Sequence, residues 1–548
     1  MAELNMVQLN AEQRAAVEHG EGPLLIVAGA GTGKTRVIVE RVGHLLGTVP
    51  GLEPENILAI TFGNKAAEEI RQRAGERFGE RALGCRFSTF HAFCYELLLE
   101  EAPAKALDRI DHWIFLRRHL ESLELDTYLK VSEPGRFLGE LVDFCSRCQD
   151  NLVTPDEYTA YVEKVADDCL RASRQGPPRK ECAEPEIARQ REVARMFSRS
   201  AKLEEQEHLL SFGAMISRTV ALLDAKPELL ARLQRRYRFI LVDEFQDTNL
   251  AQVELLARLA GERKNLTVVG DDDQAIYRFR GASYASFHQF EQRFPGHPRV
   301  VLRQNYRSTQ RILEVAAAAI APNSKDRYQP GKRLETSNPQ GRKVEVWEFP
   351  DAGQQSEFVA QEIAHRIQTG EAKAYSDFAV LYRAHSYRNR LVEALRRRGV
   401  PFAIRNLAID NLPPVRDMVA CLRAIGRPED SVSLARLLAG PRWEMEASLL
   451  WEGCRLARER QCSLREVVED SGWGGQWPGK AKLLGFLSRY RKLSREQRLR
   501  SWFPLLRQEL DLFGLKEEGD DTALGAFTDF VIQWDQEKST AGLLGEFL

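Results

Sequence analysis

Residues 24–35 read Leu-Leu-Ile-Val-Ala-Gly-Ala-Gly-Thr-Gly-Lys-Thr, and this stretch decides the fold. The apolar run Leu24–Val27 is short and lies between glycine-containing turns, which is typical of a buried parallel strand. The glycines after it allow the backbone to curl so that its N–H groups point at phosphate oxygens. A helix beginning at Lys34 would add the partial positive charge of its N-terminus. The stretch therefore predicts a strand, a phosphate-binding loop and a helix; the alternative is a chance glycine-rich turn.

The side chains of this loop indicate what it binds. Lys34 would neutralise the β- and γ-phosphates of ATP, and the Thr35 hydroxyl would bind Mg²⁺. The loop begins with Ala28, where the general pattern has glycine. The residues expected to bind the nucleotide here are Ala28, Gly29, Ala30, Gly31, Thr32, Gly33, Lys34 and Thr35.

A second motif carries paired carboxylates. The apolar run Phe239–Val242 ends in Asp-Glu-Phe-Gln-Asp-Thr at residues 243–248. An acidic pair at the end of a buried strand needs a cationic partner, because unpaired buried charge is costly. Asp243 is placed to hold Mg²⁺ and Glu244 to orient or deprotonate the attacking water. An ordinary acidic turn is the alternative, which the phosphate loop makes less attractive.

Strand and helix signals alternate around both motifs. Ile57–Phe62 predicts a second strand, a helix follows over 65–78, and Leu266–Val269 predicts another strand. This alternation indicates an α/β fold with a parallel sheet. Residues 92–235 lack strand signals and are interpreted as a largely helical insertion.

Further apolar runs predict the start of a second α/β domain. They are Val300–Arg303, Val344–Phe349, Phe378–Tyr382 and Val400–Ile404, and from about residue 410 the pattern is helical again. The expected domains are residues 1–91 with 236–290, an insertion over 92–235, a second domain over 291–408 and its helical insertion over 409–548.

Bulk composition restricts the possibilities less than the motifs do. Lys plus Arg number 78 and Asp plus Glu 79, so the net charge of −1 gives no general nucleic-acid signal. A DNA site must then be a local patch. One candidate is residues 480–500, where eight Lys or Arg residues accompany a single acid, Glu496. Such a helix could contact a duplex backbone, or it could be an ordinary solvated face.

Cysteines and apolar runs indicate the setting. Nine cysteines in 548 residues do not make a disulfide framework. Cys145, Cys148, Cys169 and Cys182 could form a metal or iron–sulfur site, but their irregular spacing favours reduced, mostly buried thiols. No apolar run approaches the roughly 20 residues that span a membrane, and the N-terminus lacks a signal-peptide pattern. We expect a cytoplasmic protein without a membrane partner.

The two motifs together resemble the UvrD/Rep/PcrA helicases of superfamily 1. Further stretches resemble the motifs of that family in the same order, and Gly63 stands where threonine is usual. These stretches are Leu9–Gln13 (the Q motif), Thr61–Ala67 (motif Ia), Ser88–His91 (motif Ib), Gly270–Ala282 (motif III) and Asn305–Ser308 (motif IV). The resemblance runs from about residue 8 to about residue 405.

The resemblance implies an ATP- and Mg²⁺-dependent 3′→5′ DNA helicase acting in DNA repair, replication or recombination. It implies two RecA-like parallel-sheet domains, the second incomplete, each with a largely helical insertion. Gln13 would contact the adenine edge, and Arg36 and Tyr306 would stack on its ring. Gln274 would sense the γ-phosphate, and Arg307 would arrive from the second α/β domain to stabilise phosphoryl transfer.

The resemblance also implies DNA-binding side chains, which would stack on bases or contact phosphates of single-stranded DNA and of single-strand/double-strand junctions. Core packing is the alternative for the aromatic ones. The candidates are Phe62, Asn64, Lys65, His91, Tyr277, Phe279 and Arg280.

Two motifs of the family are absent from residues 410–548. Family members carry motif V and motif VI, with a second catalytic arginine, after the second helical insertion. We therefore expect a truncated product, a fragment or one piece of a split motor, with a further chain supplying the remainder. The alternatives are the motor part of a RecB- or AddA-like helicase–nuclease, for which no nuclease motif is present, and a non-motor protein that binds ATP and DNA.

Overall fold

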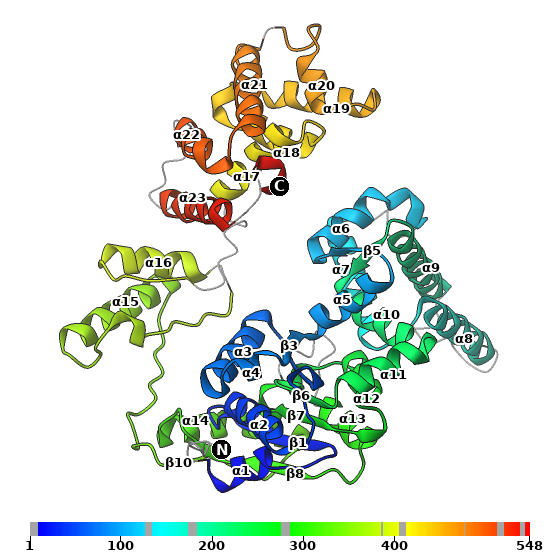
Figure 1. The fold of residues 1–548 in the computed structure, drawn as a ribbon. Coiled ribbons are helices and arrows are strands. Elements are labelled where there is room, and N and C mark those ends of the chain that lie inside the picture. Colours follow the sequence, from blue (N-terminus) through cyan, green and yellow to red (C-terminus); the bar gives the residue numbers. More distant parts are fainter. Residues whose placement is uncertain are drawn as a thin grey trace. The chain divides into compact units, whose positions relative to one another are not determined.

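Figure 1 shows the fold of the chain in a computed structural model. The chain forms two compact units, residues 1–346 and 347–548. The described residues are 9–125, 134–173, 184–275, 285–384, 387–404, 413–475, 477–511, 520–537 and 543–547.

A six-stranded parallel sheet forms the centre of the first unit. In spatial order its strands are β3 (Arg86–Thr89), β2 (Ile57–Thr61), β6 (Phe239–Val242), β7 (Leu266–Gly270), β1 (Leu24–Ala28) and β8 (Arg299–Leu302). In the register, Leu25 of β1 lies opposite Val268 of β7 on one side and Arg299 of β8 on the other. Every residue of the four central strands is buried, as expected for a parallel sheet covered on both faces. The predicted α/β class and parallel sheet are confirmed.

Alternating side chains of β1 enter two separate cores. Leu25 and Val27 join the core on one face of the sheet, whereas Leu24 and Ile26 join the core on the other face. The helices covering the second face are α1 (Ala11–Val17), α2 (Lys34–Thr48), α3 (Asn64–Phe78) and α4 (Glu80–Leu83). Those covering the first face are α5 (Phe90–Glu101), α10 (Phe212–Ala225), α11 (Pro227–Arg236), α12 (Leu250–Ala260) and α13 (Ala285–Arg293).

Most of the segment expected to be a helical insertion forms a small body with its own core. It extends from the sheet through α5 and α10 (Figure 1). Its elements are β4 (Lys105–Leu107), α6 (Arg109–Arg118), α7 (Pro134–Asp150), α8 (Pro155–Ser173), α9 (Glu184–Gln206) and β5 (Leu209–Ser211). Strands β4 and β5 pair in parallel, which the sequence pattern did not predict. Phe115, Leu138 and Phe197 lie in this core.

The first strand after the boundary expected near residue 290 belongs to the first sheet. We predicted that Val300–Arg303 would begin a second α/β domain, but β8 pairs with β1 and completes the first sheet. Without β8, the buried strand β1 would present an unpaired edge. Strand β9 (Gln304–Asn305), α14 (Gln310–Ile320) and β10 (Glu335–Thr336) also belong to the first unit, and β9 pairs with β10.

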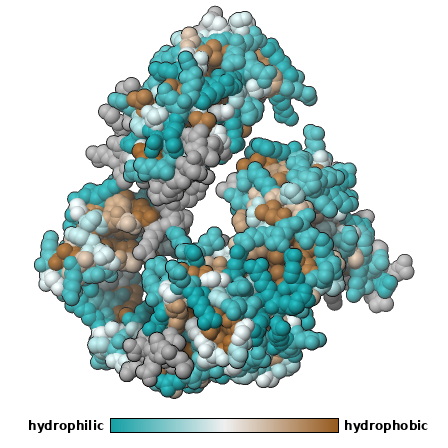
Figure 2. Space-filling view, viewed as in Figure 1, coloured by the Kyte–Doolittle hydropathy of each residue, from teal (hydrophilic) through white to brown (hydrophobic). Residues whose placement is uncertain are grey.

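Three further runs predicted as strands form no ladder among the described residues. They are residues 344–349, 378–382 and 400–404. Several of their apolar side chains are exposed, Val346 at 89% and Leu381 at 94%. The molecular surface around α15 and α16 shows apolar patches (Figure 2). An apolar run becomes a strand only when a neighbouring strand satisfies its N–H and C=O groups, and the described residues supply none here.

The second unit is helical. Its first pair, α15 (Ala352–Gln368) and α16 (Arg388–Arg397), packs around Ala360, Ile363 and Leu395. A larger core including Trp443, Trp502 and Phe503 joins the remaining helices. These are α17 (Pro413–Gly426), α18 (Ser431–Leu438), α19 (Ala447–Glu459), α20 (Leu464–Glu469), α21 (Lys480–Glu496), α22 (Leu499–Asp511), α23 (Asp520–Glu537) and α24 (Leu544–Phe547). Within the described ranges, no helix has both the length and the apolarity needed to cross a membrane.

Candidate nucleotide-binding site

The phosphate loop lies at the carboxyl end of β1, where the chain topology changes direction. The next strand along the chain, β2, lies on one side of β1, and β8 lies on the other. Ligands of open α/β sheets bind at such a switch point. A cavity of about 1050 Å³ opens here, lined by the loop and by residues that follow β6, β7 and β9.

The loop and the carboxylate motif meet at hydrogen-bond distance. Lys34 Nζ lies 2.9 Å from Glu244 Oε2. The Thr35 hydroxyl donates to Asp243 Oδ2 at 3.4 Å, and the Glu244 backbone N–H donates to Asp243 Oδ1 at 2.9 Å. Glu244 has a φ of +51°, a left-handed conformation that is costly for glutamate and typical of functional sites. The structure thus brings together all four side chains that the two motifs predicted.

Asp243 lies deep at the base of this cluster. Burial and the neighbouring Glu244 charge raise the pKa of Asp243 from 3.8 to about 6, although Lys34 and the hydrogen bonds act against that rise. A buried carboxylate whose ionised form is disfavoured would be stabilised by a bound cation. The Asp243 carboxylate and the Thr35 hydroxyl are hard oxygen donors of the kind that Mg²⁺ prefers, so the donor set fits this ion.

A glutamine connects the carboxylate motif with the residues after β7. Gln246 Nε2 donates to Glu244 Oε2 at 2.7 Å, and its Oε1 accepts from the Asp271 N–H at 2.9 Å. Asp271 Oδ2 in turn accepts from Gln274 Nε2 at 2.6 Å. Gln274 lines the cavity, as expected for a γ-phosphate sensor. Sequence reasoning missed Gln246 and Asp271, although both lie inside motifs that it singled out.

Gln13 lies against the phosphate loop, and its contact with adenine stays a prediction. Its side chain is fully buried, and its Nε2 donates to the Thr32 carbonyl at 2.9 Å. Its Oε1 accepts from the Asn10 N–H, while the Asn10 side chain accepts from the Gln13 N–H, which makes a capping box. Gln13 therefore also supports the phosphate loop. The Asn-x-x-Gln spacing could have revealed Asn10.

The two residues expected to stack on adenine both lie close to the phosphate loop. Arg36 lines the cavity, and its Nη2 is buried without a hydrogen-bond partner among the described residues. Tyr306 is 48% exposed, and its hydroxyl accepts from Asn10 Nδ2 at 3.0 Å. The Tyr306 ring and the Arg36 guanidinium thus both lie near the loop, and their stacking on adenine stays a prediction.

Arg307 also lines the cavity, and it follows β9. Its origin in a second α/β domain stays a prediction. The segment is fixed on the loop, since the Tyr306 N–H donates to the Gly31 carbonyl at 2.9 Å and Asn305 Nδ2 donates to the Ala30 carbonyl at 2.6 Å. Gly31 has a φ of +73°, and a Cβ there would lie 2.6 Å from Asn305 Nδ2. Only glycine fits this approach.

The described DNA candidates gather at the carboxyl ends of β2 and β3. Phe62 is 39% exposed, and Asn64 and Lys65 are exposed at the start of α3. The ring of His91, on the first turn of α5, packs edge-to-face on Phe212 with centroids 5.3 Å apart. Tyr277, Phe279 and Arg280 lie outside the described residues.

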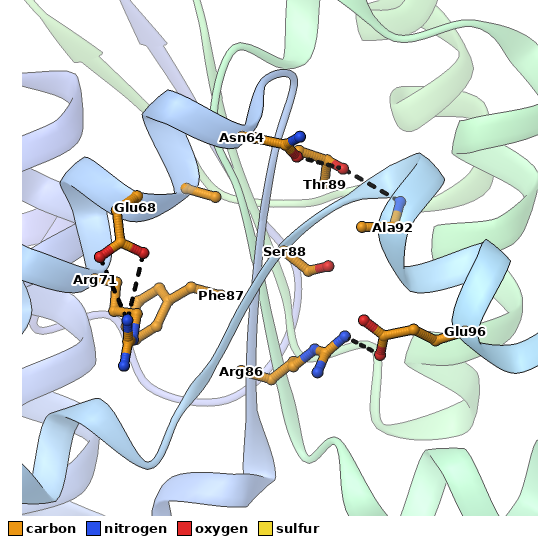
Figure 3. Close-up of a pocket in the computed structure, with 10 residues that line it drawn as sticks. Asn64, Glu68, Arg71, Arg86, Phe87, Ser88, Thr89, Ala92 and Glu96 are labelled. Atoms are coloured by element: carbon orange, nitrogen blue, oxygen red, sulfur yellow. Dashed lines mark hydrogen bonds and ion pairs between the residues drawn. The ribbon is translucent and has the colours of Figure 1, made fainter. Parts of the chain in front are cut away.

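A hydrogen bond joins the DNA candidate Asn64 to Thr89, at the start of α5 (Figure 3). The Thr89 hydroxyl donates to Asn64 Oδ1 at 3.4 Å and accepts from the Ala92 N–H at 3.2 Å, capping α5. Below them, a cavity of about 250 Å³ runs along the edge strand β3, flanked by the ion pair of Arg86 and Glu96. The starts of α3 and α5 are therefore held side by side.

The cysteines do not form a metal-binding group in the part of the chain that the structure describes. Cys145 and Cys148 are buried on α7 without a disulfide. Burial, with smaller contributions from Glu204 and Cys148, raises the pKa of the Cys145 thiol well above its ordinary value, and burial raises that of Cys148 to about 11. Such thiols stay protonated, in agreement with the reduced and buried interpretation for these two residues. Cys169 is disulfide-bonded, so the interpretation is wrong for that residue. Cys182 lies outside the described residues.

The basic stretch 480–500 forms α21 and the start of α22, and part of its charge is already paired. Arg489 pairs with Glu509, and both Arg498 and Arg500 pair with Asp535. Lys480 donates to the backbone carbonyl of Asp470. Exposed cations without an ion-pair partner among the described residues are Lys482, Lys492 and Arg495.

Fold and site together define a nucleotide-binding α/β protein with a phosphate loop and a carboxylate pair. Comparison with known families is more specific. A family model described as the UvrD/REP helicase N-terminal domain matches residues 9–295, and one described as the UvrD-like helicase C-terminal domain matches residues 300–471. The chain belongs to the UvrD/REP helicase family.

Individual relatives agree with this assignment. The ATP-dependent DNA helicase UvrD1 of Mycobacterium tuberculosis (strain ATCC 25618 / H37Rv) is 36% identical over 446 residues, which cover 79% of this chain and 54% of the relative. The ATP-dependent DNA helicase PcrA of Staphylococcus epidermidis (strain ATCC 12228 / FDA PCI 1200) is 34% identical over 442 residues, 79% of this chain and 56% of the relative. PcrA of Staphylococcus aureus (strain NCTC 8325 / PS 47) is 32% identical over 475 residues, 85% and 60% respectively. The chain thus spans between 54% and 60% of these relatives.

Proposed function

We propose that this chain binds and hydrolyses MgATP in response to single-stranded DNA. It would act as part of a helicase that moves 3′→5′ during DNA repair, replication or recombination. The observation that carries the proposal is the meeting of Lys34, Thr35, Asp243 and Glu244 at one end of the sheet. A motor of this family needs these four groups, and they come from two loops 208 to 210 residues apart in the chain.

The roles of the four side chains follow from their chemistry. Lys34 would exchange its ion pair with Glu244 for the β- and γ-phosphates, which frees the carboxylate to accept a proton from the attacking water. Thr35 and Asp243 would hold Mg²⁺, which neutralises charge on the phosphate oxygens. Arg307, which lines the same cavity, would stabilise the charge that develops during transfer.

Coupling to DNA would use the carboxyl ends of the same sheet. The phosphate loop follows β1, and the exposed Phe62 follows β2 in the same parallel sheet. Stacking of bases on exposed aromatic rings contributes roughly 1–3 kcal/mol per base without reading sequence. The exposed cations of α21 would add contacts to a duplex backbone at a single-strand/double-strand junction.

The exposed apolar side chains of residues 344–349, 378–382 and 400–404 bear on how the motor is completed. We propose that strands outside these 548 residues pair with these segments, either in the same chain or in a partner chain. A cytoplasmic location stays a prediction.

ATP hydrolysis by the purified chain, with and without single-stranded DNA, tests the proposal. We expect stimulation by DNA, and a loss of at least about 100-fold in Lys34→Ala, because the phosphates lose their buried cation. Strand separation is then compared on duplexes with a 3′ or a 5′ single-stranded tail. Tight binding of single-stranded DNA without ATP hydrolysis or ATP-dependent strand separation would contradict the motor function. It would favour a non-motor protein that binds ATP and DNA.

A further inference from the structure

Residues 327–336, called the clasp here, contact both the acidic residues 271–273 after β7 and the phosphate loop. Arg327 Nε lies 2.5 Å from Asp273 Oδ1, and the Gln329 N–H donates to Asp272 Oδ2 at 2.9 Å. At the other end of the clasp, a Cβ on Gly29 would lie 2.5 Å from Leu334 Cδ2. The clasp therefore contacts both the residues after β7 and the phosphate loop itself.

Lys332 is the buried cation of the clasp. Its side chain is 1% exposed, and its Nζ lies 2.6 Å from Asp271 Oδ1, at ion-pair distance from Asp272 and 3.1 Å from Asp273 Oδ2. Burial alone would lower the pKa of Lys332, but the charges of Asp271 and Asp272 outweigh it and raise that pKa. Lysine is almost never fully buried without such partners. These three aspartates could otherwise hold a metal ion, and the ammonium already supplies their positive charge.

The contacts of Asp271 lead from this cation to the nucleotide cavity. Its Oδ1 accepts from Lys332, while its Oδ2 accepts from the amide of Gln274 at 2.6 Å. Its backbone N–H donates to Gln246, which also bonds Glu244. Since a glutamine amide carries two N–H groups, the bond to Asp271 uses one and leaves the other, with the carbonyl, for a ligand. Lys332 is thus one carboxylate away from Gln274.

We propose that Lys332 is a positioning residue for the γ-phosphate: its ammonium fixes Asp271, and Asp271 orients the Gln274 amide toward the end of the triphosphate. The inference rests on the proposed ATP-binding function and adds a residue to that site. Lys332 lines the nucleotide cavity, but its side chain is only 1% exposed, so the inference has it act on the γ-phosphate through Asp271 and Gln274.

The preference of the full chain for a triphosphate over a diphosphate tests the role of Lys332. Calorimetry gives Kd values for the Mg²⁺ complexes of ADP and of the slowly hydrolysed analogue ATPγS. The triphosphate preference is the Kd for ADP divided by the Kd for ATPγS. We expect Lys332→Met to lower this preference at least fivefold, to within twofold of the preference of Gln274→Ala. Adding Lys332→Met to Gln274→Ala should then change nothing more, because both act through one amide. Lys343→Met, at an exposed site, serves as the matched control.

A second variant separates positioning from folding. Lys332→Met leaves two carboxylates buried without their cation, whereas Lys332→Met with Asp272→Asn removes one of those charges and keeps Asp271. We expect the double variant to fold, as judged by circular dichroism, and still to lack the triphosphate preference. A wild-type preference in that double variant, or an equal weakening of both nucleotides, would overturn the inference alone. Absence of nucleotide binding by the wild-type chain would overturn the proposed function together with it.

Discussion

Strand β1 and residues 378–382 are both five-residue apolar runs, but their surroundings differ. Each residue of β1 is completely buried, and β7 and β8 pair with it on its two sides. In 378–382, Leu381 is 94% exposed, and no ladder forms with described residues. An apolar run thus becomes a rigid support only where a neighbouring strand pairs with it on each side.

The same difference explains why the chemistry gathers at one place. Because β1, β6 and β7 are adjacent and in parallel register, the loops at their carboxyl ends reach one another. Lys34 and Glu244 meet at 2.9 Å for this reason. By contrast, residues 344–349, 378–382 and 400–404 include none of the candidate functional side chains. Substitutions at the paired edge should therefore have the largest effects.

Glu244→Gln should produce the largest change, a loss of roughly 10²–10⁴-fold in kcat for ATP hydrolysis. Glutamine has nearly the same shape but cannot accept the proton of the attacking water. Affinity for ATP should not fall, because the substitution frees Lys34 from its ion pair. Steady-state hydrolysis and calorimetric binding measure the two quantities, with the exposed Glu262→Gln as control. A kcat above about one fifth of wild type would contradict the assigned role.

Leu25→Ala and Leu381→Ala test the structural side of the comparison. Removing the buried Leu25 side chain should cost about 2–5 kcal/mol of unfolding free energy, since it leaves a cavity between paired strands. Removing the exposed Leu381 side chain should cost less than about 0.5 kcal/mol. Denaturant unfolding, with hydrogen exchange assigned separately to peptides of each unit, measures both. A large cost at Leu381 would show that its segment is packed in solution.

The sequence predicted the parts of this comparison that are local. The strand, loop and helix around Lys34, and the carboxylates after β6, follow from short patterns of known physical purpose. Contacts such as Asn305 on Ala30, Leu334 on Gly29 and Lys332 on Asp271 join residues 61 to 305 positions apart, so no local pattern announces them. The apolar runs at 300–303 and 378–382 look alike, and only the available neighbours decided that the first became a strand.

Asp243 should make the first unit less stable as the pH rises in Mg²⁺-free buffer. Because its pKa is raised from 3.8 to about 6, the folded state binds the proton more tightly than the unfolded state. The resulting stability is complete below the unfolded pKa and is lost as the pH rises through about 6. The loss amounts to about 3 kcal/mol, at 1.36 kcal/mol per pKa unit. Unfolding free energies of wild type and Asp243→Asn between about pH 4 and 7 measure it, and a difference between them that is constant with pH would contradict it.

The smallest effect on stability is expected when Val346→Thr and Leu381→Thr are combined. Threonine keeps the extended backbone preference but replaces exposed apolar surface, so unfolding free energy should stay within about 0.5 kcal/mol of wild type. Self-association should weaken, because exposed apolar side chains favour contact between molecules. Sedimentation velocity over a range of concentrations measures association, and ATP affinity serves as the control for the paired edge. A loss of more than about 1.5 kcal/mol would mean that these segments are buried in solution, and the contrast with β1 would no longer hold.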